Sequence, residues 1–481
     1  MPIQFDQLPL LTDFYEFTMA YTYFKENKHK DIAYFDMFVR TVPDNGGFMI
    51  FNGLDRLITV IENFKFTKAD ISFLKKTYGF DQDFLDYLLN MKLHLDIWSV
   101  EEGTPVFANE PLVTVRGNLI QAQIIETVLL ICINYPILVT TKASRIVYAA
   151  KGRAVMEFGA RRAQGIDASL EGARNAVIAG CVGTSNTLAG LKYGIPVSGT
   201  IAHSYIQLHE TEYEAFLNYC KINPTNSVLL VDTYDTLKSG VVNAIKVAKD
   251  YLIPNGYKLN AIRLDSGDLA YLSKKARIML DEAGLHSTKI IASNSLDEFI
   301  IDDLILQEAK IDIFGVGENL VTAKSNPVLG GVYKVVAYEK DEEIIPVIKI
   351  SDNITKITNP GLKKLIRFYD NESKKALADL ICLADEVIPL DSYTLFDPDY
   401  PWKKKTITNY YYRLLQVPVF VNGFLVYNRK TTLQTKAYCK EQMETLWDEV
   451  KRLRNPHNYY VDLSDKLWNL KHNLIDRNKK V

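Results

Sequence analysis

The chain has 481 residues, of which 47% are hydrophobic and 24% are charged. These shares match ordinary folded proteins and exclude a chain that is disordered throughout. Lys and Arg number 56 against 58 for Asp and Glu, a net charge of −2, which argues against a nucleic-acid or membrane-surface protein. The five cysteines are scattered without a Cys-x-x-Cys pair, which excludes a disulfide framework and a zinc ribbon.

No segment of the sequence predicts export or membrane insertion. Residues 1–17 lack a basic stretch followed by an apolar core, which a secretory signal requires. The longest uncharged stretches, residues 127–141 and 175–191, are shorter than the roughly 20 apolar residues of a membrane span. We therefore expect a cytoplasmic protein.

Residues 1–124 are expected to form an N-terminal domain of mixed helices and strands. Thr12 or Asp13 can cap a helix in which the aromatic residues at positions 14, 17, 21 and 24 share one apolar face. Tyr15 lies about 100° round from position 14 and so leaves that face. Strand-like runs follow at residues 33–40 and 106–116.

Residues 125–338 carry a repeated pattern. After a helical stretch at 122–133, short apolar runs each end in polar or glycine residues and lead into a helix. The runs end at residues 157–159, 199–203, 232–235, 263–266, 293–295 and 315–317. From residue 203 the intervals of about 32, 30, 28 and 22 residues fit βα units. Repeated βα units predict a parallel sheet with helices outside, and chemistry at every strand end favours an α/β barrel over an open doubly wound sheet.

Residues 339–481 show no catalytic motif. This segment begins with a charged stretch and is richer in Lys, Tyr and Trp than the rest. Proline-containing turns at residues 396–401 interrupt it, and a helix is expected near residues 436–454.

Several motifs allow a functional and a structural interpretation. Asp265–Asp268, after Arg263, suits contacts to sugar hydroxyls or a phosphate–magnesium group, but equally a turn with an Asp helix cap. Gly315 and Gly317 expose N–H groups as anion sites do, or simply form a tight turn. A lone His203 is more often structural, although a barrel would point it into the active-site mouth.

Phe158-Gly159-Ala160-Arg161-Arg162 places an aromatic face beside two fixed cations. This pairing could hold a flat anionic ring, or it could be core packing beside a surface ion pair. A P-loop and an H-E-x-x-H zinc motif are both absent from the sequence.

Six motifs together resemble nicotinate phosphoribosyltransferases. In chain order they are LTDFY at 11–15, FGARR at 158–162, GTIAHS at 199–204, LVDTYD at 230–235, RLDSGDL at 263–269 and LGGVYK at 329–334. The resemblance implies a type II phosphoribosyltransferase: an irregular α/β barrel plus a mixed α/β domain that the flanking segments, 1–124 and 339–481, build together. One departure is Glu318, where some relatives have Thr.

The resemblance also implies the reaction. Phosphoribose would pass from phosphoribosyl pyrophosphate to nicotinate, giving nicotinate mononucleotide and pyrophosphate for NAD synthesis. ATP would be the co-substrate, coupled through a phosphohistidine, and Mg²⁺ would act on the substrate pyrophosphate. The enzyme would be a cytoplasmic homodimer with shared active sites.

The family's site residues carry over to matching positions of this chain. Catalysis is assigned to His203 (also the phosphorylated residue), Arg161, Asp235 and Asp265. Nicotinate binding is assigned to Tyr15 from the partner subunit, Phe158, Asn186, Thr200 and Arg263. Binding of phosphoribosyl pyrophosphate is assigned to Ser293, Asn294, Gly315, Gly317 and Glu318.

Three alternatives remain open. A nicotinamide-using relative would share the fold but differ in pocket charge. Its Asp before a Thr-Val-Ala-Gly stretch corresponds here to Asn186, before Thr187–Gly190, which favours nicotinate. A quinolinate-using relative would lack the ATP-coupled histidine. A noncatalytic metabolite-binding paralogue would be expected to lose His203 or the Arg263/Asp265 pair, and all three are present.

Overall fold

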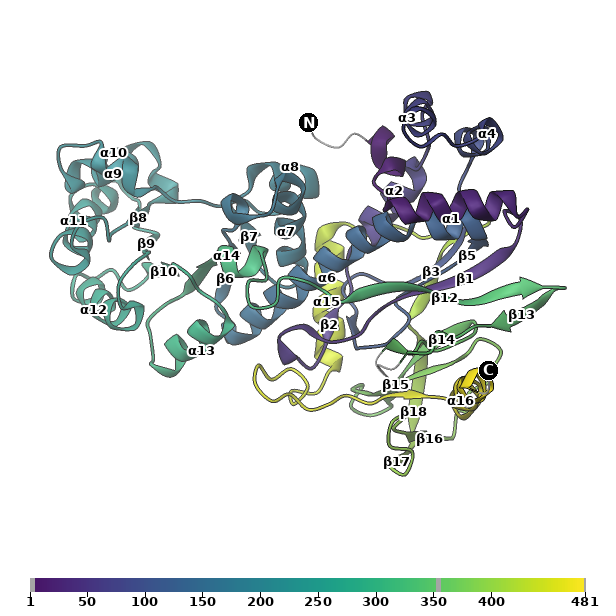
Figure 1. The fold of residues 1–481 in the computed structure, drawn as a ribbon. Helices are drawn as coiled ribbons and strands as arrows, with labels where there is room; N and C mark the ends of the chain where they lie inside the picture. Colours follow the sequence, from purple (N-terminus) through teal and green to yellow (C-terminus); the bar gives the residue numbers. More distant parts are fainter. Residues whose placement is uncertain (1–4, 352–355, 480–481) are drawn as a thin grey trace. The chain divides into compact units, whose positions relative to one another are not determined.

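The computed structural model describes residues 5–351 and 356–479, and these form two compact units (Figure 1). Unit 1 takes residues 1–138, 328–431 and 437–481, and unit 2 takes residues 139–327 and 432–436. The N-terminal and C-terminal segments therefore build one unit together, as expected. The boundaries lie at 138/139 and 327/328 rather than 124/125 and 338/339. The shift arises because α6 (Glu126–Ala149) starts in unit 1 and β12 (Gly331–Lys340) belongs to the unit 1 sheet.

Unit 1 is built on a seven-stranded sheet that joins distant parts of the chain. Its order is β13-β12-β1-β5-β3-β19-β20. Besides β12, the strands are β13 (Glu343–Pro346), β1 (Ile32–Val39), β5 (Val113–Asn118), β3 (Asp96–Val100), β19 (Gln416–Val421) and β20 (Phe424–Leu425). All neighbours pair antiparallel. The run predicted at 33–40 is confirmed as β1, whereas the run at 106–116 divides into β4 (Pro105–Val106) and β5.

A second, four-stranded sheet completes the core of unit 1. Its order is β18 (Tyr410–Leu414), β14 (Lys363–Asp370), β15 (Ala376–Leu383) and β21 (Val461–Leu463). Arg367 on β14 and Asp379 on β15 are fully buried and pair at 2.6 Å. Smaller two-stranded sheets are β2 (Met49–Ile50) with β4, and β16 (Ser392–Phe396) with β17 (Lys404–Thr408).

Helices cover the sheets of unit 1. They are α1 (Phe14–Lys25), α2 (Leu54–Asn63), α3 (Lys68–Tyr78), α4 (Gln82–Asn90), α5 (Leu119–Ile124), α16 (Asp465–Lys479) and the part of α15 (Thr432–Thr445) from residue 437 on. The expected apolar face of α1 is only partly buried: Phe17 is 3% exposed, but Phe14 is 43% exposed and stacks on Tyr78, with ring centroids 4.1 Å apart. The helix expected near 436–454 is α15, which ends nine residues earlier.

The combined helical stretch Leu119–Ala149 is long and apolar enough to cross a membrane by length and composition. This helical stretch is longer than the uncharged run at residues 127–141, whose length argued against a membrane span. Within the described residues, 72% of its most apolar window is buried inside the protein. A core helix passes the same test, so this single helix is weak evidence for a membrane span.

Glu16 of α1 is fully buried in unit 1. One carboxylate oxygen accepts a hydrogen bond from Thr127 Oγ1 at 2.5 Å, and the other, Oε2, has no hydrogen-bond partner in the part of the chain that the structure describes. Burial, with added repulsion from Glu126, raises the pKa of Glu16 to about 8. Neutral glutamic acid is therefore the form that the folded protein holds at pH 7.

Replacing Glu16 by Gln should remove a pH-dependent loss of stability. Between about pH 4.5 and pH 8 the folded protein holds a proton that the unfolded chain has released. The wild-type free energy of unfolding should therefore fall as pH rises through this window, by up to about 1.4 kcal/mol per pH unit. Urea unfolding from pH 5 to 9 measures the slope. Glu282→Gln, at the exposed last residue of α12 (Leu269–Glu282), is the control. An unchanged slope in Glu16→Gln would contradict the assignment.

Unit 2 is built on a six-stranded parallel sheet in the order β7-β6-β11-β10-β9-β8. The strands are β7 (Gly183–Thr184), β6 (Ala154–Glu157), β11 (Ile313–Val316), β10 (Lys289–Ser293), β9 (Ala261–Leu264) and β8 (Val228–Leu230). Every neighbouring pair is parallel. This is the irregular α/β barrel expected from the βα repeat.

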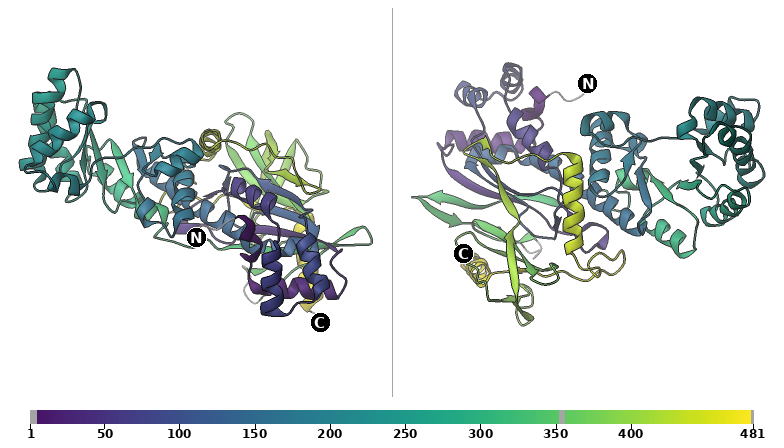
Figure 2. Two further views of the ribbon diagram at one scale, coloured as in Figure 1. Left: turned by 90° about the horizontal axis from the view of Figure 1, so that it is seen from above. Right: turned by 180° about the vertical axis from the view of Figure 1, so that it is seen from behind.

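Helices lie outside the strands of unit 2, and the teal helices near β8 to β10 are seen again from behind in Figure 2. They are α7 (Ile166–Ile178), α8 (Thr187–Tyr193), α9 (His203–Gln207), α10 (Glu212–Ile222), α11 (Val241–Val247), α12 (Leu269–Glu282), α13 (Glu298–Leu306) and α14 (Glu318–Val321).

One predicted strand of unit 2 is wrong. The run ending at 199–203 contains no strand, only an isolated bridge between Val197 and Thr184. Pro196 and Gly199 interrupt the run, and both residue types disfavour a regular strand. The short β7 pairs with β6 instead. His203 consequently begins α9 rather than ending a strand.

Candidate active site

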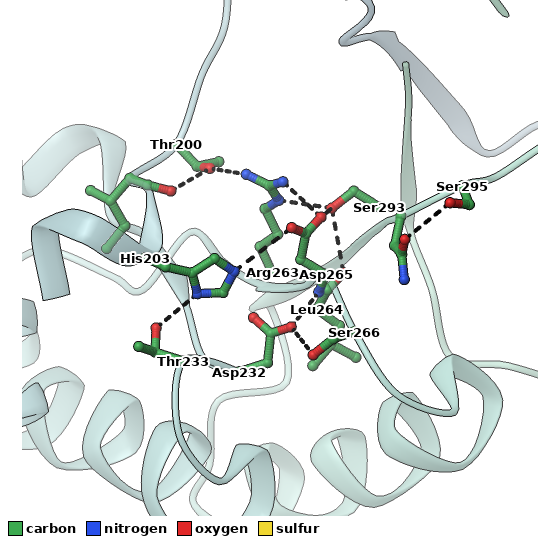
Figure 3. Close-up of polar contacts among 12 residues, drawn as sticks. Thr200, His203, Asp232, Thr233, Arg263, Leu264, Asp265, Ser266, Ser293 and Ser295 are labelled. Atoms are coloured by element: carbon green, nitrogen blue, oxygen red, sulfur yellow. Dashed lines mark hydrogen bonds and ion pairs between the residues drawn. The ribbon is translucent and has the colours of Figure 1, made fainter. Parts of the chain in front are cut away.

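A polar cluster lies where β8, β9 and β10 end, beside the segment that leads into α9 (Figure 3). Arg263, on β9, is at its centre and has three partners. Its Nη1 donates to Thr200 Oγ1 at 2.9 Å, its Nε to Ser293 Oγ at 2.8 Å and its Nη2 to Asp265 Oδ1 at 2.9 Å. Because parallel strands end at one edge of a sheet, side chains that follow different strands meet here. The three contacts fix the position of the guanidinium.

Asp265 joins Arg263 to the histidine. Its Oδ1 also accepts a 2.5 Å hydrogen bond from Ser293 Oγ, and its Oδ2 lies 3.8 Å from His203 Nε2. On the other side of the ring, His203 Nδ1 lies 3.1 Å from Thr233 Oγ1. The His203 side chain is 40% exposed, so the ring is held on both edges yet open to solvent. In the tautomer that donates from Nδ1 to Thr233, Nε2 carries the lone pair.

Asp232 is a site residue that the sequence analysis left without a role. Its Oδ2 accepts hydrogen bonds from the Asp265 N–H at 2.9 Å and from Ser266 Oγ at 2.6 Å. Its Oδ1 is buried and has no hydrogen-bond partner within residues 5–351 and 356–479. The sequence does contain an indication of this position, because Asp232 is the first carboxylate after the β8 run in the LVDTYD motif.

Asp235, the carboxylate chosen from the same motif, lies differently. It is exposed, its Oδ1 accepts the N–H groups of Leu237 and Lys238, and its Oδ2 pairs with Lys238 Nζ at 3.5 Å. These contacts, chiefly the Lys238 N–H, lower the pKa of Asp235. Among the described residues, no hydrogen bond or ion pair joins it to the cluster of Figure 3, so its catalytic role stays a prediction.

Phe158, directly after β6, forms an aromatic surface near the cluster. Its ring lies against Gly315, since a Cβ there would fall 2.5 Å from two ring carbons. The guanidinium carbon of Arg263 is 5.8 Å from the ring centroid. A flat ring and a fixed cation therefore lie side by side, which suits an aromatic anion.

The remaining predicted residues lie on the loops around these strand ends. Arg161 is exposed, and Gly317 precedes α14. Asn294 is exposed with a φ of 99°. Glu318 pairs with Lys324 at 2.7 Å, which lowers the pKa of that carboxyl. Their roles toward the substrate stay predictions.

Tyr15 belongs to unit 1, on α1. It is 47% exposed, and the Glu126 carboxylate lies near its hydroxyl. Partial burial and this neighbouring carboxylate raise the pKa of Tyr15. The phenol ring is therefore neutral, which suits stacking against another ring.

Asn186 serves as the N-cap of α8. Its Oδ1 accepts from the Ala189 N–H at 3.1 Å, and its Nδ2 donates to Ser169 Oγ at 3.0 Å. Both ends of the amide thus have partners within unit 2. A direct contact between Asn186 and nicotinate stays a prediction.

Asn186→Asp tests that prediction. Aspartate still caps α8, but it adds a negative charge that would repel a carboxylate substrate. If Asn186 lines the nicotinate pocket, kcat/KM for nicotinate should fall at least about tenfold, because like charges in a desolvated pocket cost several kcal/mol. Asn186→Ser keeps a neutral cap and should stay near wild type. Equal kcat/KM values for the two variants would mean that Asn186 caps α8 and does not line the nicotinate pocket.

No cluster of three or more potential metal ligands occurs within residues 5–351 and 356–479. Asp232, whose Oδ1 has no hydrogen-bond partner among the described residues, and Asp265 are two acids that follow β8 and β9. One or two carboxylates with substrate phosphates are typical of a Mg²⁺ site. This donor set fits Mg²⁺ that is carried mainly by a pyrophosphate group.

The chain is similar to nicotinate phosphoribosyltransferases along almost its whole length. Models of the N-terminal domain, the family and the C-terminal domain of these enzymes match residues 10–134, 153–380 and 362–471. The nicotinate phosphoribosyltransferase of Bacillus subtilis is 43% identical, covering 97% of this chain and 95% of its own. That of Dictyostelium discoideum is 35% identical, covering 97% and 88%.

Solved structures share the fold. Human nicotinic acid phosphoribosyltransferase matches with a TM-score of 0.85 at 28% identity, over 96% of this chain and 99% of that chain. Nicotinate-nucleotide pyrophosphorylase from Pyrococcus furiosus has a TM-score of 0.71 at 21% identity, over 92% and 97%, and supports the fold alone. With its sequence and its fold both shared, the chain belongs to the nicotinate phosphoribosyltransferase family.

Proposed function

We propose that this protein transfers phosphoribose from phosphoribosyl pyrophosphate to nicotinate, giving nicotinate mononucleotide for NAD synthesis, in a reaction coupled to ATP. The observation that carries this proposal is the arrangement around Arg263. A guanidinium fixed by Thr200, Ser293 and Asp265 lies beside the Phe158 ring. A planar aromatic acid can stack on Phe158 while its carboxylate meets Arg263 or Thr200.

The bond changes follow from the substrates. The pyridine nitrogen bonds to the anomeric carbon as the carbon–oxygen bond to pyrophosphate breaks. The transition state carries positive charge on the sugar, so catalysis requires a held nucleophile and a neutralised leaving group. Mg²⁺, when bound, supplies charge on the pyrophosphate. Asp232 and Asp265 would hold it together with the substrate, and the exposed Arg161 would lie near the leaving group.

The coupling to ATP is assigned to His203. Its Nε2 would attack the γ-phosphorus, and the bond to the ADP oxygen would break, leaving ADP and a phosphohistidine. Thr233 holds the opposite ring nitrogen at 3.1 Å, and Asp265 lies 3.8 Å from Nε2. The contact with Thr233 supports an imidazole that is oriented through Nδ1 and can attack through Nε2.

The phosphate of the sugar substrate is assigned to the loops after β10 and β11. Ser293 is held by Arg263 and Asp265, and Asn294, Gly315, Gly317 and Glu318 follow at the same strand ends. Backbone N–H groups of such loops can bind a 5′-phosphate. Because Glu318 pairs with Lys324, it would contribute through its backbone rather than its side chain.

The proposed enzyme is a cytoplasmic homodimer in which Tyr15 of one subunit completes the site of the other. The exposed position of Tyr15 on α1 supports this role. With Phe158 on one face of the pyridine ring and the partner's Tyr15 on the other, the ring would be stacked on both sides.

Pyrophosphate release with nicotinate, nicotinamide and quinolinate, each with and without ATP, tests the function. We expect release with nicotinate that ATP stimulates, and little with the other two acceptors. Release with quinolinate regardless of ATP, or with nicotinamide, would instead assign the enzyme to the corresponding relative. Binding of nicotinate without any release would identify a noncatalytic protein.

A further inference from the structure

Glu157, the last residue of β6, carries a carboxylate that the proposed reaction does not use. The residue is fully buried. Its Oε1 accepts a short hydrogen bond from the Gly159 N–H, and its Oε2 accepts one from Thr184 Oγ1 at 2.6 Å. Burial raises the pKa of Glu157, and these two bonds oppose the rise.

The carboxylate of Glu157 has no cationic partner within the described ranges. Removing a charged group from water without a counter-ion is unfavourable by several kcal/mol unless hydrogen bonds replace the lost hydration. An apolar residue would fill this strand end at lower cost. The presence of an acid here is therefore not explained by packing, and we look for its role in the hydrogen bonds that it makes.

The two hydrogen bonds of Glu157 join two neighbouring strand-end turns. The bond to Gly159 closes the turn after β6, which carries Phe158. The bond to Thr184 reaches the end of β7, and Thr184 Oγ1 in turn accepts the Asn186 N–H at 3.0 Å. The Ser185 N–H also donates to the Glu157 carbonyl at 2.9 Å.

The turn after β6 is closely packed around this carboxylate. A Cβ at Gly159 would fall 2.7 Å from Val321 and 2.8 Å from Glu157 Oε1, so only glycine fits there without a shift. The Phe158 ring lies directly against Gly315. With so little free space, a movement of the Glu157 carboxylate is transmitted to Phe158 rather than absorbed.

We propose that Glu157 is a positioning residue for the nicotinate ring: through Gly159 and Thr184 it fixes the Phe158 surface against the turn that begins α8. This inference rests on the proposed function, because it assumes that the acceptor substrate stacks on Phe158. Glu157 itself touches neither substrate. Its effect should appear mainly in the binding of the aromatic acid, which stacks on the Phe158 ring. The effect on phosphoribosyl pyrophosphate should be small, because only Gly315 of its assigned residues lies against that ring.

The first variant removes the bond to Glu157 Oε2, together with the bond that Thr184 Oγ1 accepts from the Asn186 N–H, at nearly constant shape. Thr184→Val lacks the hydroxyl, whereas Thr184→Ser keeps it. For Thr184→Val we expect the KM for nicotinate to rise about tenfold, the lower range for a lost hydrogen bond to a charged group. The KM for phosphoribosyl pyrophosphate should stay within about twofold. Thr184→Ser should return the nicotinate KM to within about twofold of wild type.

Glu157→Gln is the second variant and is used alone if Thr184→Val does not fold. Its amide oxygen can accept from Gly159 while its NH₂ group donates to Thr184. We expect a smaller rise in the nicotinate KM, again without a change for phosphoribosyl pyrophosphate.

A merely structural role would give a different result. Equal losses for both substrates, or no change in either KM, would overturn the inference. These outcomes differ from a failure of the proposed function, which would show as absent nicotinate turnover in the wild-type enzyme.

Discussion

Replacing His203 by alanine should abolish the stimulation of the reaction by ATP and leave a weak ATP-independent transfer. The imidazole is the one group assigned to receive the γ-phosphoryl group, and Asp265 and Thr233 only orient it. Losing a covalent nucleophile typically lowers the rate of its step by a factor of about 10³ or more. Nucleotide hydrolysis and mononucleotide formation, measured together with and without ATP, separate the two parts of the reaction.

His209 offers a matched control for that experiment. It lies six residues further on and is half-buried, and its Nδ1 contacts the Tyr205 carbonyl oxygen at 2.8 Å. His209→Ala should retain ATP stimulation. Incubation with γ-labelled ATP should label wild type and His209→Ala with an acid-labile phosphate and leave His203→Ala unlabelled. Full ATP coupling in His203→Ala would contradict the phosphohistidine assignment.

Mixing two inactive variants should restore activity if sites are shared between subunits. Tyr15→Ala removes the ring assigned to the partner's site, and Arg263→Met removes the guanidinium and its three hydrogen bonds. In a hybrid dimer, one site then carries both defects and the other carries neither. After full subunit exchange half of the dimers are hybrids, so roughly a quarter of all sites should be intact.

The control for the mixing experiment is a pair of variants from the same side of the site. Arg263→Met mixed with Phe158→Ala should stay inactive, because each subunit then has a defective barrel. Subunit exchange is followed by native mass spectrometry of differently tagged chains. Complete exchange with no recovery of activity in the Tyr15→Ala and Arg263→Met mixture would exclude a shared site.

The unit 2 barrel could be predicted because its information is local. Each βα unit lies within about 30 residues, and parallel strands bring their ends to one edge. That reasoning correctly joined Arg263, Asp265 and Ser293, which the structure brings into contact. Thr200 and His203 join the same cluster from the start of α9 and the segment before it, where the predicted strand is missing. Unit 1 pairs β1 with β12 and β3 with β19, across about 300 residues, and no local pattern specifies such partners.

Other features depended on details that residue patterns do not contain. The choice between Asp232 and Asp235 turns on where β8 ends, and three residues decide whether a carboxylate meets the cluster or caps the next helix. The Glu157–Thr184 bond could not be predicted from the sequence either, because β7 has only two residues and shows no periodicity. Its position follows from packing against β6 rather than from its own sequence.

The interrupted construction of unit 1 has a consequence for synthesis on the ribosome. All six strands of the barrel sheet lie between residues 154 and 316, so they are available together while the chain is still growing. The seven-stranded sheet needs β1, from residue 32, and β19, which ends at residue 421. At about 5–20 residues per second, the first strands wait for tens of seconds before their last partners emerge. The nascent N-terminal segment is therefore the part of this protein that most needs chaperone protection.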